Sequence, residues 1–189
     1  MRKTNLVRAL TAVLATLLWI GSSAAAQSRV SIDNFGKVND TYFRGAQPEG
    51  GDYASLAEMG VKTVINLASH DADRNEAAMV ARNGMMYLQI PMSTRVEPTR
   101  SQIASFLTIV NDPARQPVYV HCVGGRHRTG VMTAVYRMTH DGFTAEQAFR
   151  EMKQYKYGAD FLHPEFKRFV YSYRPETSPL TATHVAATR

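Results

Sequence analysis

The 189-residue sequence contains one cysteine, Cys122, and no long hydrophobic run. One cysteine excludes an internal disulfide framework and any metal site built from several thiolates. The histidines outside the segment around Cys122 lack metal-ligand spacing, so we expect no metal. No apolar stretch reaches the roughly 18–20 residues that span a bilayer. Ordinary glycine and proline contents exclude collagen-like and low-complexity chains. What remains, with 44% apolar residues, is a chain that can bury one sizeable core.

Residues 1–26 have the three parts of a secretory signal peptide: basic residues near the start, an apolar stretch over 9–20, and small residues ending in Ala24-x-Ala26. We expect cleavage before Gln27 and export to the periplasm or the medium. An uncleaved anchor is the alternative, which the short apolar stretch disfavours. Cleavage would remove three basic residues and lower the formal net charge from +6 to +3. That charge is too small to indicate a nucleic-acid partner, and we expect no membrane association after cleavage.

Hydrophobic periodicity predicts strands alternating with helices. Residues 30–43 form an irregular or short-strand lead-in. The predicted strands are 61–67, 86–90 and 117–121, and the predicted helices are 53–59, 71–83, 99–110, 129–139, 144–155 and 164–173. Gly60 is placed to end the first of these helices in the left-handed conformation, and Thr144 and Gln147 can form a capping box at the start of the helix over 144–155. We therefore expect one α/β domain over 27–173, with a mainly parallel sheet covered by helices on both faces. Residues 174–189 lack periodicity and are predicted to be a flexible tail.

The segment from Cys122 to Arg128 connects a predicted strand to a predicted helix. Gly124 and Gly125 allow the backbone to curl so that several N–H groups point inward and cradle an anion. The helix that follows adds its positive N-terminal dipole. The planar fork of Arg128 can hold two phosphate oxygens. The same field favours the thiolate form of Cys122.

A thiolate beneath a bound phosphoryl group is arranged for in-line attack through a covalent thiophosphate. We expect the phosphate to be bound by Arg128 and by the loop residues Val123, Gly124, Gly125, Arg126 and His127. Thr129 can donate a hydrogen bond to the sulfur and assist its later departure. His121 is expected to order the loop from beneath. Arg44 is interpreted either as lining the rim or as forming a structural ion pair.

The run His-Cys-x5-Arg-Thr-Gly resembles the signature of the cysteine-dependent protein tyrosine and dual-specificity phosphatases, especially small bacterial and fungal members. Residues 42–48 and 141–148 are also similar, so the resemblance covers roughly 38–173. It implies a phosphate monoester hydrolase that forms a phosphocysteine on Cys122, binds the phosphate with Arg128 and needs no cofactor.

The resemblance also implies an aspartate on a separate upstream loop, which protonates the leaving oxygen. Thr94 stands where that aspartate is expected, and Glu97 is the nearest carboxylate. Three alternatives stay open. Glu97 acts as the catalytic acid, the enzyme uses substrates with good leaving groups, or the chain is a weak or inactive phosphate-binding pseudophosphatase. A general acid contributes about 10²–10⁴ in rate.

Arg126 and His127 would enlarge the positive field of the loop, or else point into solvent. In the first case they suit a polyanion, and Arg126-His127-Arg128 resembles a run in fungal phosphatases that act on inositol pyrophosphates. We therefore expect a phosphorylated protein or a small phosphate ester such as an inositol phosphate as substrate, and a monomeric enzyme. An inositol polyphosphate phosphatase is one alternative, and a rhodanese-type sulfurtransferase, which also uses a loop cysteine, is another.

Overall fold

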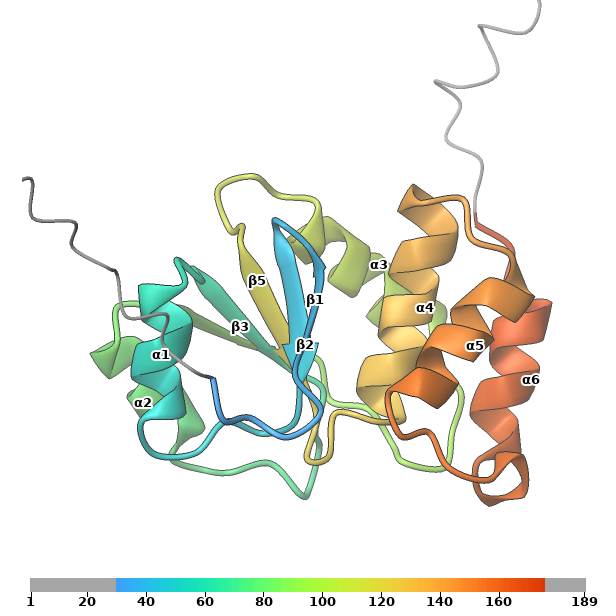
Figure 1. The fold of residues 1–189 in the computed structure, drawn as a ribbon, viewed down its shortest axis with the longest axis horizontal. Helices are drawn as coiled ribbons and strands as arrows, with labels where there is room; N and C mark the ends of the chain where they lie inside the picture. The colour runs from blue at the N-terminus through green and yellow to red at the C-terminus, as the bar shows by residue number, and fades with distance from the viewer. Residues whose placement is uncertain (1–29, 176–189) are drawn as a thin grey trace, which may run out of the picture.

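The computed structural model describes residues 30–175. Its centre is a five-stranded sheet in the order β1-β2-β5-β3-β4 (Figure 1). β1 is antiparallel to β2, and all other neighbours are parallel. The strands are β1 (Gly36–Asn39), β2 (Tyr42–Gly45), β3 (Thr63–Asn66), β4 (Met86–Gln89) and β5 (Val118–His121). The expected mainly parallel sheet is confirmed.

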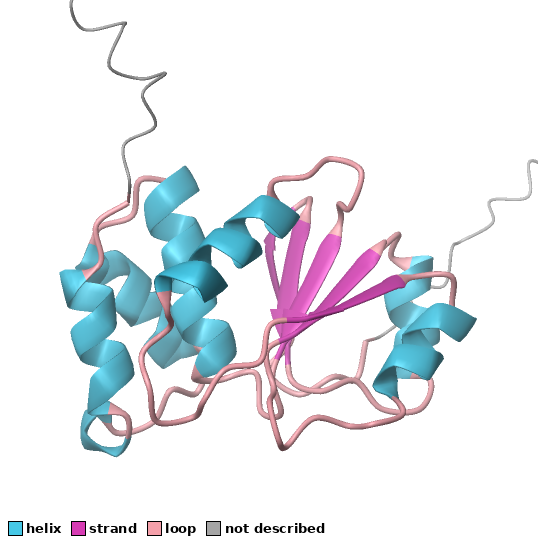
Figure 2. Cartoon of the chain, turned by 180° about the vertical axis from the view of Figure 1, so that it is seen from behind, coloured by secondary structure: helices cyan, strands magenta, loops and turns pink. Residues whose placement is uncertain are grey.

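Helices cover both faces of this sheet (Figure 2). One face carries α1 (Asp52–Glu58) and α2 (Glu76–Arg82). The other carries α3 (Arg100–Val110), α4 (Arg128–His140), α5 (Ala145–Gln154) and α6 (Pro164–Ser172), with the short 3-10 turn η1 (Asp160–Leu162) before α6. Between residues 30 and 175, no helix is both long and apolar enough to cross a membrane.

Each face of the sheet has its own hydrophobic core. Phe106 of α3, Val131 of α4 and Phe166 of α6 belong to the larger core, and all three are fully buried. Leu56 and Val80 belong to the smaller core beneath α1 and α2. All four residues of β3 and of β5 are buried, as expected for central parallel strands covered on both sides.

Two helix starts follow directly from the sequence. Thr99 and Thr144 accept hydrogen bonds from the backbone N–H of Gln102 and Gln147, and each glutamine side chain accepts in return from the backbone of its threonine. The capping box expected at Thr144 is therefore confirmed. Gly60 has a φ of +83°, which confirms its left-handed conformation after α1.

The lead-in contains short strands, which is one of the two forms expected for it: they make an antiparallel hairpin, β1–β2, whose register shifts between Lys37 and Asn39. One expectation needs correction. The helix predicted over 71–83 begins only at Glu76. Residues 71–75 form turns instead, because the carboxylate of Asp73 accepts from the N–H of Asn75 and that of Asp71 from the N–H of Ser69. This frees Asp71 to reach another part of the chain.

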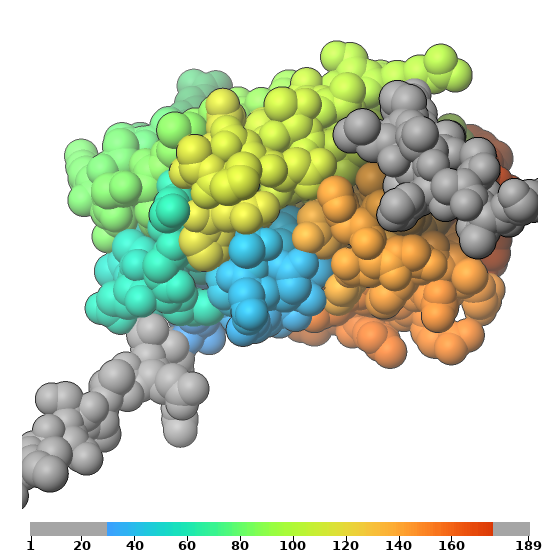
Figure 3. All heavy atoms as spheres, turned by 90° about the horizontal axis from the view of Figure 1, so that it is seen from above, coloured from blue at the N-terminus to red at the C-terminus, as the bar shows by residue number. Residues whose placement is uncertain are grey.

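The parallel strands bring their carboxyl ends to one edge of the sheet. In Figure 1 the loop after β5 and the loop after β3 both lie along the lower edge. The opposite edge faces the viewer in Figure 3, where the blue residues of the β1–β2 segment lie between the teal residues around α1 and the orange residues around α5. Loops at the carboxyl ends of parallel strands commonly form binding sites, and the lower edge carries the segment around Cys122.

Candidate active site

The loop between β5 and α4 makes a sharp turn at Gly125. This residue has a φ of +62°, and a Cβ added there would lie 2.3 Å from the carbonyl carbon of Gly45 and 2.6 Å from the nitrogen of Ala46. Both neighbours are backbone atoms, which cannot move aside cheaply. Close packing against the end of β2 therefore requires glycine at position 125.

Residues from the N-terminal part of the domain hold the loop in place. The carbonyl oxygen of Gly125 accepts hydrogen bonds from Nη2 of Arg44 (2.6 Å) and from Nδ2 of Asn34 (2.8 Å). The carbonyl oxygen of Val123 accepts from the backbone N–H of Gln47 at 3.1 Å. With carbonyl groups tied outward, the loop's N–H groups are left to face the cradle.

Arg44 is fully buried beneath this loop rather than at its rim. Its guanidinium lies 4.0 Å from the centre of the Tyr155 ring, and its Nε and Nη1 have no hydrogen-bond partner among residues 30–175. No salt bridge to Arg44 exists in the described part of the chain, so neither sequence interpretation holds. Burial lowers the pKa of Arg44, while the nearby Tyr42, Tyr155, Glu151 and Cys122 side chains oppose this.

Cys122 lies at the base of the loop. It is 3% exposed and belongs to the larger core. A negative charge on Cys122 would raise the pKa values of both Arg44 and Arg128.

Arg128, at the first position of α4, is 4% exposed and forms a two-point ion pair with Asp71. Its Nη1 donates to Oδ1 at 2.8 Å and its Nη2 to Oδ2 at 2.6 Å. Burial lowers the pKa of Arg128, but the hydrogen bonds and charges of Asp71 and Cys122 outweigh this, so the pKa lies above its ordinary value. The hydrogen bonds from Arg128 hold the pKa of Asp71 at about 2.

His121 lies within a buried polar cluster below the loop. Its Nε2 is 2.8 Å from Oε1 of Glu76, although neither ring nitrogen has a partner aligned for a hydrogen bond. Glu76 also accepts from Nε2 of Gln47 at 2.8 Å and from Nδ2 of Asn66 at 2.5 Å. Because His121 and Glu76 are both fully buried, the cluster ties the end of β5 to the start of α2.

His127 is fixed beside α6 rather than free to transfer protons. Its Nε2 is 2.9 Å from the carbonyl oxygen of Tyr157, and its ring centre lies 3.7 Å from that of His163. Burial is the main cause that lowers the pKa of His127, and the charges of His163, Arg126 and Arg128 lower it further. The imidazole is therefore held in its neutral form.

Of the remaining candidate residues, Thr129 and Arg126 lie at the loop and the start of α4, whereas Glu97 lies elsewhere. Oγ1 of Thr129 is buried without a partner among the described residues, at the N-terminal turn of α4. Arg126 is half-exposed and lies 3.8 Å from Asp33. Glu97 accepts from Arg168 of α6 at 2.8 Å and lines a separate groove of about 660 Å³ against α3 and α6. The structure does not bring Glu97 to the loop.

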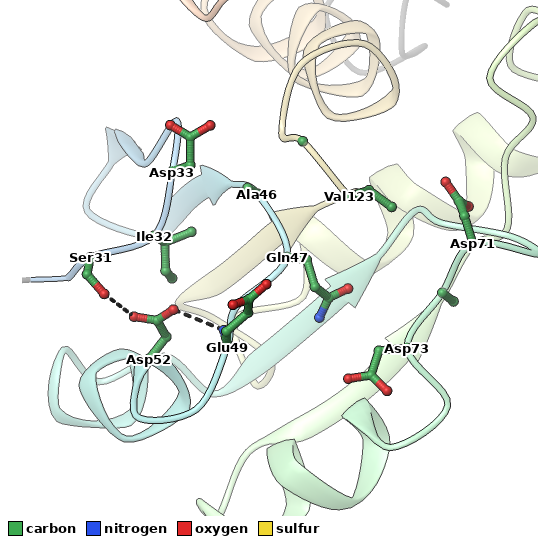
Figure 4. Close-up of a pocket in the computed structure, with 12 residues that line it drawn as sticks. Ser31, Ile32, Asp33, Ala46, Gln47, Glu49, Asp52, Asp71, Asp73 and Val123 are labelled. Carbon is green, nitrogen blue, oxygen red and sulfur yellow. Dashed lines mark hydrogen bonds between the residues drawn. The ribbon is translucent and has the colours of Figure 1, made fainter.

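A cavity of about 590 Å³ opens beside the loop, with Val123, Gly124 and Gln47 in its wall (Figure 4). Apart from Ser31, its other polar side chains are acidic. The carboxylates come from three parts of the chain. Asp33 lies before β1, Glu49 and Asp52 lie around the start of α1, and Asp71 and Asp73 lie in the turns that follow β3. Figure 4 shows Asp52 between Ser31 and the backbone of Glu49, to which it is hydrogen-bonded.

A protein-family model described as "DSP-PTPase phosphatase fused to NAD+ kinase" matches residues 24–168, which is most of the chain. The chain belongs to this family. It is thus a member of the cysteine-dependent tyrosine and dual-specificity phosphatase superfamily, as the signature around Cys122 predicts.

Relatives of this phosphatase domain include a bacterial protein and a plant protein. The dual specificity protein phosphatase TpbA of Pseudomonas aeruginosa is 29% identical over 139 residues, covering 72% of this chain. The inositol diphosphatase DSP2 of Oryza sativa is 27% identical over 108 residues, covering 55% of this chain. The matched parts span only 61% and 53% of the lengths of those two proteins.

Solved structures share the fold. The core catalytic domain of the PP-IP phosphatase SIW14 from Saccharomyces cerevisiae, in complex with citrate, superposes with a TM-score of 0.67 at 24% identity, covering 76% of this chain and 87% of that one. A cysteine-to-serine variant of P. aeruginosa TpbA, in complex with pTyr, gives 0.62 at 23% identity, covering 81% and 89%. At these identities the likeness establishes the fold alone.

Sequence reasoning missed Asp71, Glu76 and Asn34 as parts of this site. One signal was present for Asp71: it follows β3, which neighbours β5, so its loop must lie beside the loop that holds Cys122. The periodicity of 71–83 instead suggested that Asp71 belongs to a helix, so this position in the loop was not predicted. Nothing in the sequence marks Asn34, whose contact with Gly125 joins residues 91 positions apart.

Proposed function

We propose that this protein hydrolyses phosphate monoesters through a phosphocysteine on Cys122. The observation that carries the proposal is the loop between Cys122 and the buried Arg128, whose sharp turn at Gly125 and outward carbonyl groups fit an anion cradle. Membership of the phosphatase superfamily supports the same chemistry.

In the first step the Cys122 thiolate attacks the phosphorus in line with the ester oxygen. A sulfur–phosphorus bond forms, the phosphorus–oxygen bond breaks, and the alcohol or phenol leaves with a proton taken from solvent or an acid. In the second step water attacks the phosphorus, the sulfur leaves as thiolate, and inorganic phosphate is released. Arg128, the loop N–H groups and the N-terminus of α4 stabilise the equatorial charge in both steps. Oγ1 of Thr129 is buried at this end of α4 and can donate to the departing sulfur.

The leaving group receives little help from carboxylates in this arrangement. Thr94 cannot act as an acid at neutral pH, Glu97 is paired with Arg168, and the carboxylate of Asp71 is held deprotonated by Arg128. We therefore propose that the enzyme favours leaving groups that depart without full protonation, such as phenols. A test compares phenyl phosphate with alkyl phosphates, and we expect kcat/KM to fall by at least 10² for the alkyl esters.

Among the two substrate classes we favour a phosphotyrosyl protein over an inositol polyphosphate. The acidic wall of the cavity repels a ligand that carries many negative charges, and Asp33 offsets the charge of Arg126. The relatives include both a dual-specificity phosphatase and an inositol diphosphatase. Phosphate release from phosphotyrosyl peptides with basic and with acidic flanks, beside an inositol diphosphate, tests this preference. Faster release from the inositol diphosphate would contradict it.

We also propose that the chain is exported and cleaved before Gln27. The proposal rests on the sequence pattern of residues 1–26, which lie outside the described residues. N-terminal sequencing of protein purified from the host's periplasm or medium tests it. Full-length protein retained in the cytoplasm would contradict it.

The deciding experiment for the activity is the Cys122→Ser variant. We expect it to release no phosphate from p-nitrophenyl phosphate while it still binds inorganic phosphate in calorimetry, because the cradle remains. Turnover above a few per cent of the wild-type rate would exclude Cys122 as the nucleophile. Wild-type protein that binds phosphate without any turnover would instead indicate a pseudophosphatase, and persulfide formation with thiosulfate would indicate a sulfurtransferase.

A further inference from the structure

Asp71 contacts the phosphate-binding arginine from outside the loop. It lies in the turn that follows β3, where the backbone N–H of Ser69 also donates to its Oδ1 at 3.1 Å. Arg128 is 4% exposed, and the Asp71 side chain is 29% exposed at the wall of the cavity. The pair therefore joins a loop of one strand to the helix that follows the neighbouring strand.

The atoms used in this pair show which edge of the guanidinium it occupies. A guanidinium has five N–H donors on two usable edges: an end formed by Nη1 and Nη2, and a side formed by Nε and Nη2. Asp71 accepts from Nη1 and Nη2, and the carbonyl oxygen of Met92 lies 3.4 Å from Nη1. Nε and the second hydrogen of Nη2 remain on the side edge. A phosphate can accept two hydrogen bonds from that edge without displacing Asp71.

We propose that Asp71 is the positioning residue of this active site, holding the Arg128 guanidinium by its end so that its side edge faces the phosphate. The inference rests on the phosphatase function proposed above. It gives Asp71 a role in binding the phosphoryl group and no role in protonating the leaving group. Arg128 can form the same two hydrogen bonds to phosphate in the ground state and in the transition state only if its plane is fixed beforehand.

Two further observations agree with positioning rather than acid catalysis. The hydrogen bonds from Arg128 keep the pKa of Asp71 at about 2, so the carboxylate carries no proton to donate near neutral pH. Both oxygens of Asp71 already accept hydrogen bonds, which orients them toward Arg128 rather than toward a leaving group.

The test uses Asp71→Asn, Asp71→Glu and, as matched control, Asp73→Asn. The control removes the same charge from the same loop and cavity wall but has no contact with Arg128. Each variant is assayed with p-nitrophenyl phosphate and with phenyl phosphate, and the inhibition constant of inorganic phosphate is measured. Thermal unfolding confirms that each variant is folded.

We expect Asp71→Asn to lower kcat/KM by about 10²-fold, by the same factor for both esters, and to weaken inhibition by phosphate at least tenfold. Asp71→Glu should recover part of both losses. The loss in kcat/KM for Asp73→Asn should be at least tenfold smaller than the loss for Asp71→Asn. A loss that grows with the basicity of the leaving group would overturn the proposal in favour of a proton donor. Tighter phosphate inhibition in Asp71→Asn would overturn it in favour of a blocking carboxylate. Both results differ from failure of the proposed function, in which wild-type protein itself turns over neither ester.

Discussion

The buried guanidinium of Arg44 donates a hydrogen bond of 2.6 Å to the carbonyl oxygen of Gly125, across 81 positions of sequence. This cation lies under the loop that holds Cys122 and has no carboxylate partner among residues 30–175. A buried charge of this kind is costly unless something compensates it. A negative charge on Cys122 and, in the complex, the phosphate dianion would supply that compensation.

We expect Arg44→Met to reduce function more than stability. Methionine fills similar space but removes the charge and the hydrogen bond to Gly125. Phosphate affinity should fall about tenfold, which corresponds to about 1.4 kcal/mol. The unfolding free energy should change by about 1 kcal/mol or less, because the Nε and Nη1 of Arg44, which have no partner among the described residues, no longer need to be buried. Calorimetry with phosphate and urea unfolding measure both. A large loss of stability at unchanged phosphate affinity would show that Arg44 is structural only.

Gly125→Ala should disrupt the loop. The new Cβ would lie 2.3 Å from a backbone carbon of Gly45, in addition to the strain of a positive φ. We expect a loss of at least about 2–3 kcal/mol of unfolding free energy, or a displaced loop with little phosphate binding. Gly142→Ala is the matched control: its φ is +66°, but no atom lies within 4 Å of the new Cβ. The control should lose only about 1–2 kcal/mol. Equal losses in the two variants would refute the steric argument.

Thr144→Ala tests the helix start that the sequence predicts. Its side chain caps α5 by accepting from the N–H of Gln147 at 3.2 Å. Removing it should cost about 1 kcal/mol of unfolding free energy and leave phosphatase activity intact. Thr108→Ala serves as comparison, because Thr108 is exposed inside α3 and bonds only the carbonyl of Ala104. That variant should be neutral or slightly stabilising. The reverse order of stabilities would contradict the capping assignment.

The ion pair between Asp71 and Arg128 predicts a specific pH dependence of stability. The pKa of Asp71 is lowered from 3.8 to about 2 in the folded protein, so its contribution is complete above about pH 4 and is lost as pH falls toward 2. The difference in unfolding free energy between wild type and Asp71→Asn should therefore shrink between pH 5 and pH 2.5. Urea unfolding of both proteins at each pH measures it. A difference that stays constant would mean that the pair contributes nothing through the charge of Asp71.

Much of the fold follows from local pattern. The strand over 61–67, the helix over 99–110 and the capping box at Thr144 each depend on neighbouring residues, and the structure confirms them. Alternation of strands and helices then implied a parallel sheet covered on both faces, with the loop of Cys122 at the carboxyl edge. The Cys-x5-Arg signature indicated the family for the same reason, since all its residues lie in one short segment.

The expectations that the structure does not support concern residues whose positions depend on contacts between distant segments. Asp71 belongs to a periodic stretch that reads as a helix, and only its ion pair with Arg128 and the local turn bonds explain why the helix starts later. Arg44 was expected at the rim of the site or in an ion pair, because the sequence does not show how deeply β2 is buried. Glu97 was chosen for its place in the sequence, and the structure pairs it with Arg168. Local pattern does not encode such pairings.

The most direct test of the central claim is to trap the covalent intermediate. Wild-type protein is mixed with p-nitrophenyl phosphate, quenched in acid within one turnover, and digested for mass spectrometry. We predict a phosphoryl group on the peptide that contains Cys122, which disappears as phosphate is released and is absent in Cys122→Ser. Steady release of phosphate with no modified Cys122 at any quench time would contradict the account.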